Sequence, residues 1–235
     1  MLICPNCKAE HVVKYGKTRS GSQNYKCCEC GRRFVEQPSK KYISQETWEQ
    51  VDKLLKEKLS LRGIARVTGI SGTWLQRYVN QLYKTQILEQ RTEKKKGKLS
   101  LECDEMWSFV GNSQTKVWIW LGLDRDSREV IGVAFGKRDV VGAQALWDSL
   151  PAVYRQCAVC YTDFWEAYNK VLPCKRHKAV GKETGLTNHI ERFNNTLRQR
   201  VCRLVRKSLS FSKKLDNHIG AILYFINYYN KSLLL

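Results

Sequence analysis

Three acidic residues, Asp104, Asp163 and Glu191, are of the type that binds divalent cations through oxygen. Carboxylates that converge on a small space repel one another, and Mg²⁺, which prefers oxygen ligands, neutralises such a group well. Two Mg²⁺ ions about 4 Å apart activate a water or a DNA 3′-hydroxyl and stabilise the leaving oxygen of an in-line phosphoryl displacement. If the fold brings the three side chains together, they therefore predict the cutting and joining of phosphodiester bonds.

Glu191 belongs to the stretch Thr187–Lys207, which has the hydrophobic period of a helix that packs one side on a core. The apolar residues that recur at three- and four-residue steps are Ile190, Phe193, Leu197, Val201 and Leu204. Glu191 falls on a different side, among cations and amides. The alternative is structural, because Asn188 followed three residues later by Glu191 fits a capping box that closes the helix N-terminus. The helix alone favours the cap, whereas the two aspartates upstream favour a metal ligand.

The elements that must position these acids begin at Leu99, where the pattern changes to strands rich in β-branched and aromatic residues. The expected order is strand Leu99–Val110, strand Val117–Leu123, strand Glu129–Phe135, helix Val141–Tyr154, strand Ala158–Asp163, helix Trp165–Val171, strand Lys175–Val180 and the helix that carries Glu191. An antiparallel meander followed by alternating helices and strands is the order of the ribonuclease-H-like fold. In that fold neighbouring strands bring Asp104 and Asp163 to one end of the sheet, and the closing helix lays Glu191 opposite them.

Two further acids, Glu102 and Glu105, flank Asp104 and compete for its role. Side chains alternate along a strand, so Glu102 points to the same face as Asp104 and Glu105 points to the other. Glu102 is therefore the more serious alternative to Asp104.

Two C-x2-C pairs, Cys4 with Cys7 and Cys27 with Cys30, are separated by 19 residues. This spacing lets four thiolates converge tetrahedrally on Zn²⁺. Short apolar runs between the pairs indicate strands, so we expect a zinc ribbon in which the metal supplies folding free energy on the order of 10 kcal/mol. A redox pair or a chance pattern is the alternative. Zinc in this segment is expected to be structural.

A helix-turn-helix pattern follows the cysteine segment. After a helix over Gln45–Lys58, Ser60 and Ser71 stand at the N-cap positions of two further helices, and Gly69 makes the turn between them. The outward residues of the last helix, where side chains reach major-groove base edges, are Gly72, Thr73, Gln76, Arg77 and Asn80. The alternative is a three-helix packing unit that binds nothing. The basic cysteine segment next to it favours DNA binding.

The chain carries a formal net charge of +19 and has an isoelectric point near 9.6. Up to Lys98 there are 21 basic and 9 acidic residues, net +12, and after it 20 and 13, net +7, so both parts are basic. Lys and Arg displace counterions from phosphates, which makes double-stranded DNA the first candidate partner. The basic residues expected to bind the DNA backbone beside the acids, where the alternative is a solvated face, are Arg198, Arg200, Arg203, Arg206 and Lys207.

The sequence predicts an intracellular, cytoplasmic protein with no membrane partner. No apolar run approaches the roughly 20 residues that cross a bilayer, and the first residues lack the basic and apolar regions of a signal peptide. In a reducing compartment the clustered cysteines are expected to bind metal rather than form disulfides.

The chain resembles transposases of the insertion-sequence-one family, a bacterial and archaeal group with a DDE catalytic triad, over essentially its whole length. The motifs that carry the resemblance are the two cysteine pairs, the helix-turn-helix, Asp104-Glu-Met-Trp107, Tyr161-Thr-Asp163, His189-Ile-Glu191-Arg192, Leu197-Arg-x-Arg200, Arg203-Leu-x-Arg206-Lys207 and Phe211-Ser-Lys213. The resemblance implies that Asp104, Asp163 and Glu191 are the triad. The 27 residues between Asp163 and Glu191 agree with the short spacing in this family.

The resemblance further implies an enzyme that binds the terminal inverted repeats of an insertion sequence, cleaves the element's ends and transfers them into target DNA. Its cofactors would be two Mg²⁺ or Mn²⁺ ions together with structural Zn²⁺. We expect a homodimer or higher oligomer, because two ends must be cut together. We also expect the protein to be associated with the nucleoid. One alternative is a DNA-binding regulator of the element with an inactive catalytic domain. Another is a structure-specific nuclease such as a junction resolvase, which the sequence-reading N-terminal segments disfavour.

The expected fold class is a multidomain chain that combines α+β and α/β parts. The segments are a zinc ribbon over 1–38, a helix-turn-helix domain over 39–85, a charged linker over 86–98, a ribonuclease-H-like catalytic domain over 99–211 and a C-terminal helix over 212–235. The apolar period of the last segment predicts that it covers the core or supports self-association.

Overall fold

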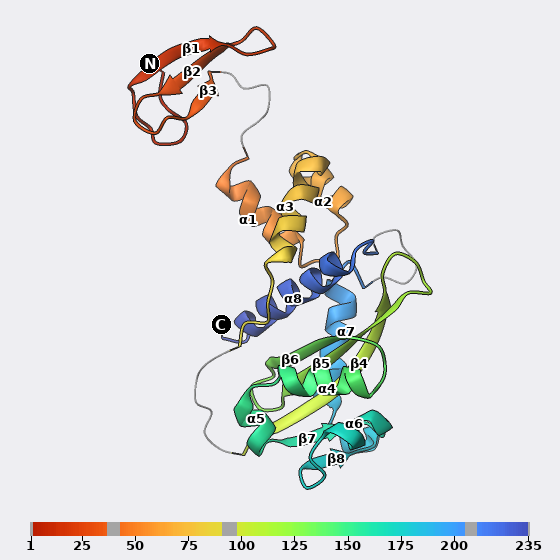
Figure 1. The fold of residues 1–235 in the computed structure, drawn as a ribbon. Helices are drawn as coiled ribbons and strands as arrows, with labels where there is room; N and C mark the ends of the chain where they lie inside the picture. The colour runs from red at the N-terminus through yellow and green to blue at the C-terminus, as the bar shows by residue number, and fades with distance from the viewer. Residues whose placement is uncertain (1, 37–42, 91–97, 205–210, 235) are drawn as a thin grey trace. The chain divides into compact units, whose positions relative to one another are not determined.

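A computed structural model describes residues 2–36, 43–90, 98–204 and 211–234 of the chain (Figure 1). The chain forms two compact units, Met1–Trp48 and Glu49–Leu235. The division falls inside helix α1, Gln45–Leu54. No helix in the described ranges is long and apolar enough to cross a membrane.

The N-terminal unit contains one small antiparallel sheet. Its strands are β1 (Val12–Lys17), β2 (Gln23–Cys27) and β3 (Arg33–Val35), in the order β1-β2-β3. Val12 pairs with Cys27, so the register places the end of β2 beside the start of β1. Most of the sheet is exposed or half-buried, and among the residues of this unit that the structure describes the fully buried side chains are those of Cys4 and Cys27. So small a core gives this unit little hydrophobic stabilisation of its own.

Two short helices follow α1 in the second unit. Ser60 caps α2 (Leu61–Thr68) by accepting a hydrogen bond from the backbone N–H of Gly63 at 3.1 Å. Gly69 ends α2 with a φ of 69°, a left-handed conformation that glycine adopts without strain. Helix α3 (Gly72–Lys84) begins after Ser71, whose side chain makes no cap hydrogen bond. These positions agree with the expected starts of α2 and α3 and with the expected turn, whereas α1 ends at Leu54 and not at the expected Lys58.

The central sheet has five strands in the order β6-β5-β4-β7-β8. Strands β4 (Ser100–Phe109), β5 (Lys116–Asp124) and β6 (Val130–Gly136) form the expected antiparallel meander. Strand β7 (Val159–Thr162) pairs in parallel with β4, and β8 (His177–Ala179) pairs in parallel with β7. This mixed sheet within a mixed α/β unit is compatible with a ribonuclease-H-like domain.

Helices connect and cover the sheet. The region expected as one helix over Val141–Tyr154 is divided at Pro151 into two helices. These elements are α4 (Val140–Ser149), α5 (Ala152–Cys157), α6 (Glu166–Val171), the 3-10 turn η1 (Lys182–Thr184), α7 (Asn188–Arg200) and α8 (Leu215–Ser232).

Two hydrophobic cores lie on opposite faces of the sheet because side chains alternate along its strands. Leu101 and Cys103 of β4 face a core that α4, α5 and α6 complete. Met106 of the same strand belongs to the other core, which contains residues of α7 and α8. Residues of α1, α2 and α3 join this second core, so the three N-terminal helices share their apolar interior with α7 and α8.

Helix α8 is closely packed against α3. A Cβ added to Gly220 would lie 2.3 Å from the carbonyl oxygen of Tyr83, so only glycine permits this approach. The residues directly after α3 also contact α8, because the side chain of Asn227 bonds to the backbone of Ile87 and Glu89 at 2.7 and 3.0 Å. The C-terminal helix therefore covers the core, one of its two expected roles.

Helix α7 is shorter than its apolar pattern predicts. It ends at Arg200, and Val201 is the C-cap with an extended backbone. Val201 and Leu204 are nevertheless buried, so the apolar period continues to describe burial after the helical hydrogen bonds end.

Candidate functional site

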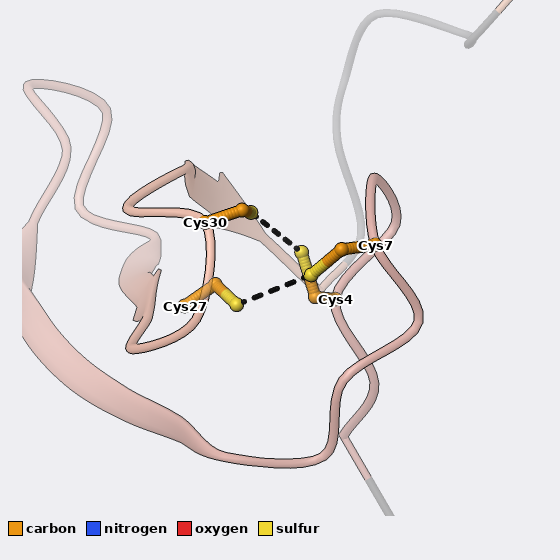
Figure 2. Close-up of side chains that lie close together, drawn as sticks. All are labelled: Cys4, Cys7, Cys27 and Cys30. Atoms are coloured by element: carbon orange, nitrogen blue, oxygen red, sulfur yellow. Dashed lines mark hydrogen bonds between the residues drawn. The ribbon is translucent and has the colours of Figure 1, made fainter.

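The four cysteine side chains of the N-terminal unit converge (Figure 2). The sulfur atoms of Cys4 and Cys30 are 3.6 Å apart, those of Cys7 and Cys27 are 3.5 Å apart, and all four lie within 4.8 Å of one another. A tetrahedral site with Zn–S bonds of about 2.3 Å needs sulfur atoms about 3.8 Å apart. The cluster therefore fits a four-thiolate zinc site.

The two cysteine loops use the same backbone device. The N–H of Lys8 bonds to the carbonyl of Cys4, and the N–H of Gly31 bonds to the carbonyl of Cys27, both at 3.0 Å. Lys8 and Gly31 have φ angles of 63° and 69°, so the backbone turns sharply after each pair. The backbone N–H of Cys7 lowers the pKa of Cys4 to about 6, whereas desolvation and the other three sulfur atoms raise the pKa of Cys7. A bound Zn²⁺ would favour the thiolate form of all four side chains.

The acids predicted to hold divalent cations lie in one pocket of the second unit. Asp104 lies in the middle of β4, Asp163 directly follows β7, and Glu191 lies in the first turn of α7. Glu102 pairs with Tyr161 in the parallel β4–β7 ladder, so continuing this register places Asp104 beside Asp163. The pocket has a volume of about 380 Å³ and is lined by Asp104, Glu105, Asp163, Val180, Lys182, Thr187, Glu191, Asn194, Asn195 and Arg198.

The surroundings of Asp104 disfavour its charged form. Burial raises its pKa to about 7, and the negative charges of Glu105, Asp163 and Glu191 add to the effect. A bound cation would oppose both causes. Within the described residues, the four cysteines are the only group of His, Cys, Asp or Glu side chains close enough for a metal ion, so the three carboxylates share a pocket without forming a tight cluster.

The donors of this pocket nevertheless fit a hard divalent cation in kind. They are carboxylate and amide oxygens, which Mg²⁺ and Mn²⁺ prefer, and no cysteine or histidine of the described ranges lines the pocket. An open pocket also leaves room for water or a phosphate oxygen in the coordination sphere.

Glu102, the rival of Asp104, has a different role. Its Oε2 accepts hydrogen bonds from the backbone N–H groups of His189 and Ile190, both at 3.0 Å. Arg125 lies 3.6 Å from its other oxygen. Glu102 thus caps the N-terminus of α7 and fixes that helix on β4, and burial raises the pKa of its carboxyl group.

The capping box considered for Asn188 and Glu191 does not occur. Helix α7 begins at Asn188, and its N-cap, Thr187, makes no side-chain cap hydrogen bond. The orphan N–H groups are satisfied by Glu102, from 87 residues earlier in the chain. Asn188 is thus not the N-cap that this capping box requires, and the role of Glu191 as a metal ligand stays a prediction.

Glu105 points to the opposite face from Asp104, as strand alternation predicts. It accepts hydrogen bonds from Tyr168 at 2.8 Å and pairs with Arg138 at 2.7 Å. The guanidinium of Arg138 lies 4.1 Å from the ring centre of Trp165 and 4.9 Å from that of Trp118. Glu105 thus ties β4 to α6 and to the residues that precede α4.

Asn194 is a pocket residue that sequence reasoning missed. Its Nδ2 donates to Oδ2 of Asp104 at 2.6 Å. It lies three residues after Glu191, on the same helix side, and this spacing is the one signal that could have identified it.

The residues predicted to read DNA bases lie along one side of α3. Thr73, Gln76 and Arg77 are exposed, and Asn80 is half-buried. Asn80 accepts hydrogen bonds from Gln76 at 2.8 Å and from Asn217 of α8 at 3.0 Å, so its carbonyl oxygen is already engaged. A groove of about 770 Å³ between α2 and α3 is lined by Leu61, Arg62, Ala65, Arg66, Gly72, Thr73, Gln76, Arg77 and Asn80.

The basic residues predicted as one clamp occupy different surroundings. Arg198 lines the carboxylate pocket. Arg200 instead donates to the backbone carbonyl of Lys56 at 2.9 Å and forms an ion pair with Glu57. The Nε atom of Arg203 is buried. The remaining members of the set, Arg206 and Lys207, lie outside the described residues.

Residues 98–231 match the family model described as IS1 transposase. The chain is 37% identical over 126 residues to the insertion element IS1 protein InsB of Shigella flexneri, which covers 54% of this chain and 92% of that protein. It is 35% identical over 126 residues to the insertion element IS1 4 protein InsB of Escherichia coli (strain K12), which covers 54% of this chain and 72% of that protein. The region matched by the family model contains all three carboxylates and begins after the cysteine cluster and α3.

Proposed function

The chain belongs to the IS1 transposase family, and we propose that it acts as a DDE transposase. In this proposal it binds the terminal inverted repeats of an insertion sequence, cuts the DNA at the element's ends and joins those ends to target DNA. Asp104, Asp163 and Glu191 are the proposed catalytic acids.

One observation carries the catalytic part of the proposal. Three acids from two strands and one helix line a single polar pocket, although 58 residues lie between the first and the second and 27 lie between the second and the third. Arg198 lines the same pocket and supplies the positive charge that a DNA phosphate needs. Glu102 lies on the same strand as Asp104 and accepts hydrogen bonds from the first turn of α7, which carries Glu191. These bonds fix the positions of Asp104 and Glu191 relative to each other.

Divalent cations are part of the proposal because the pocket's oxygen donors suit Mg²⁺ or Mn²⁺. Two such ions would supply Lewis-acid activation of a water or 3′-hydroxyl and stabilisation of the leaving oxygen. Asp104, Asp163 and Glu191 would hold the ions, and Arg198 would bind the phosphate backbone and orient the scissile strand. The half-buried carboxylate of Asp104 would be stabilised in its charged form by a cation, because desolvation disfavours that form.

DNA recognition is assigned to the helices before the catalytic domain. We propose that α2 and α3 form a helix-turn-helix over 39–85, with Thr73, Gln76 and Arg77 at base edges and Arg62 and Arg66 against phosphates. The zinc ribbon over 1–38 would be held by Cys4, Cys7, Cys27 and Cys30. A homodimer or higher oligomer is expected, because two element ends must be cut together.

The experiment that tests this function uses duplex oligonucleotides that carry the element's terminal repeat. Purified wild-type chain and the Asp163→Asn variant are incubated with or without added Mg²⁺, and the products are resolved on a denaturing gel. Omitting Mg²⁺ rather than adding a chelator keeps the zinc in place. Asp148→Asn, at an exposed position of α4, is the matched control. Nicks at the repeat that need both Mg²⁺ and Asp163 are expected.

The second candidate is a DNA-binding regulator with an inactive catalytic domain. The observation in its favour is that the three carboxylates do not cluster as the four cysteines do. Tight binding to the repeat with no Mg²⁺-dependent nick, under conditions where two ends can pair, would replace the transposase proposal with this one.

A further inference from the structure

Asn194 has the most incompletely satisfied polar side chain of the carboxylate pocket. It is 4% exposed, and its Nδ2 is committed to Asp104 at 2.6 Å. Its Oδ1 is also buried but has no hydrogen-bond partner. A buried carbonyl oxygen without a donor or cation is destabilising, so such an atom in a native site calls for a ligand.

We propose that Asn194 is a further oxygen donor to the divalent-cation site, with Oδ1 directed to the cation while Nδ2 orients Asp104. This inference rests on the proposed function, since it assigns a new residue to the same pocket. The amide suits the role because a neutral oxygen adds a ligand without adding to the repulsion among the acids. Its position three residues after Glu191 lets one helix supply both a charged and a neutral donor.

The alternative to a metal-binding role is that Asn194 has a purely structural role. If Asn194 only fills space and bonds to Asp104, any effect of its replacement would be on folding. If its oxygen binds the cation, replacing the amide with a carboxylate should preserve metal binding, since a carboxylate is also an oxygen ligand. A packing role gives the opposite result for that variant, because an extra buried negative charge beside Asp104 has no compensation.

The test is a titration of the full-length, zinc-loaded chain with Mn²⁺, followed by the electron paramagnetic resonance signal of free Mn²⁺. The variants are Asn194→Ala and Asn194→Asp, and the matched control is Asn169→Ala at an exposed position of α6. Circular dichroism and zinc content verify that each variant is folded. We expect Asn194→Ala to weaken Mn²⁺ binding about 10- to 100-fold, the range for residues that support a metal site. Asn194→Asp should bind Mn²⁺ at least as well as wild type at pH 8.

The outcomes separate this inference from the function on which it rests. Wild-type Mn²⁺ affinity in Asn194→Ala, or loss of binding in folded Asn194→Asp, would overturn the role of Asn194 and leave the transposase proposal intact. Failure of the wild-type chain to bind Mn²⁺ would overturn both. Weak binding by Asn194→Ala together with retained binding by Asn194→Asp supports the assignment even before any DNA cleavage is measured.

Discussion

The four sulfur atoms of Cys4, Cys7, Cys27 and Cys30 lie within 4.8 Å of one another, whereas Asp104, Asp163 and Glu191 share a pocket of about 380 Å³ without such convergence. The cysteines come from two similar loops, and the acids come from two strands and a helix. A closed set of four ligands is typical of structural metal, and an open pocket is typical of metal that exchanges ligands with a substrate. One unit would therefore depend on its metal to fold, while in the other the fold holds charges in position for a metal.

The largest effect is expected from a mutation that disrupts the cysteine cluster. Cys7→Ser should abolish stoichiometric zinc binding and unfold the β1–β3 sheet, because zinc contributes on the order of 10 kcal/mol to small domains of this kind. Zinc content by mass spectrometry and proteolytic sensitivity of the N-terminal unit would measure this. Cys28→Ser is the matched control, since Cys28 is exposed and lies outside the cluster. An unchanged zinc content in Cys7→Ser would show that the four cysteines do not form the predicted zinc site.

The carboxylate pocket should respond to mutation in its chemistry rather than its fold. Glu191→Gln is expected to lower metal-dependent cleavage on the order of a thousandfold, since metal-ion catalysis supplies several kcal/mol of transition-state stabilisation. Binding to the terminal repeat should stay within about twofold. Gel assays of cleavage and binding give both values, and Glu166→Gln, exposed on α6, is the control. Wild-type turnover in Glu191→Gln would exclude this residue from the mechanism.

The two sites also differ in how far the sequence predicts them. The C-x2-C spacing is local, so it identifies all four members of the cysteine cluster. Strand alternation is local too, and it places Glu102 and Glu105 on the correct faces of β4. The role of Glu102 as the cap of α7 was not predictable, because it depends on how β4 packs against a helix 87 residues away. Asn194 was missed for the same reason, since its partner Asp104 is 90 residues away.

The metal-free stability of the second unit should depend on pH through Asp104. Burial raises the pKa of Asp104 to about 7, well above the value of an exposed aspartate. Between these two pKa values the folded chain therefore holds a proton on Asp104 that the unfolded chain has released. The sign follows from linkage: this stabilisation is complete below the unfolded pKa and is lost as pH rises from about 4 to above 7. In buffer without Mg²⁺, Asp104→Asn should therefore raise Tm at pH 8 and not at pH 4, by about 2–4 °C per kcal/mol.

Added Mg²⁺ should affect the thermal stability of the wild-type chain and of Asp104→Asn differently. It should stabilise the wild-type chain at pH 8, because a ligand that binds only the folded state raises stability by mass action, and it should have little effect on Asp104→Asn. Thermal unfolding followed by circular dichroism at both pH values provides the data. A lower Tm for Asp104→Asn at pH 8 would mean that the carboxylate stabilises the fold, as the cysteine cluster does, and the contrast between the two sites would fail.

The smallest expected effect distinguishes two arginines on α7, Arg198 and Arg200. Their sequence pattern is the same, but Arg198 lines the carboxylate pocket while Arg200 pairs with Glu57 and the carbonyl of Lys56. Arg198→Ala should therefore weaken DNA binding and reduce the slope of log K against log salt by about 1, the change for one lost phosphate contact. Arg200→Ala should leave that slope unchanged and lower Tm instead, because it breaks a contact between α7 and the residues after α1. Equal reductions of the salt slope in both variants would show that Arg198 and Arg200 both bind DNA phosphates. Lining the open pocket would then not distinguish the arginine that binds a phosphate from the one that does not.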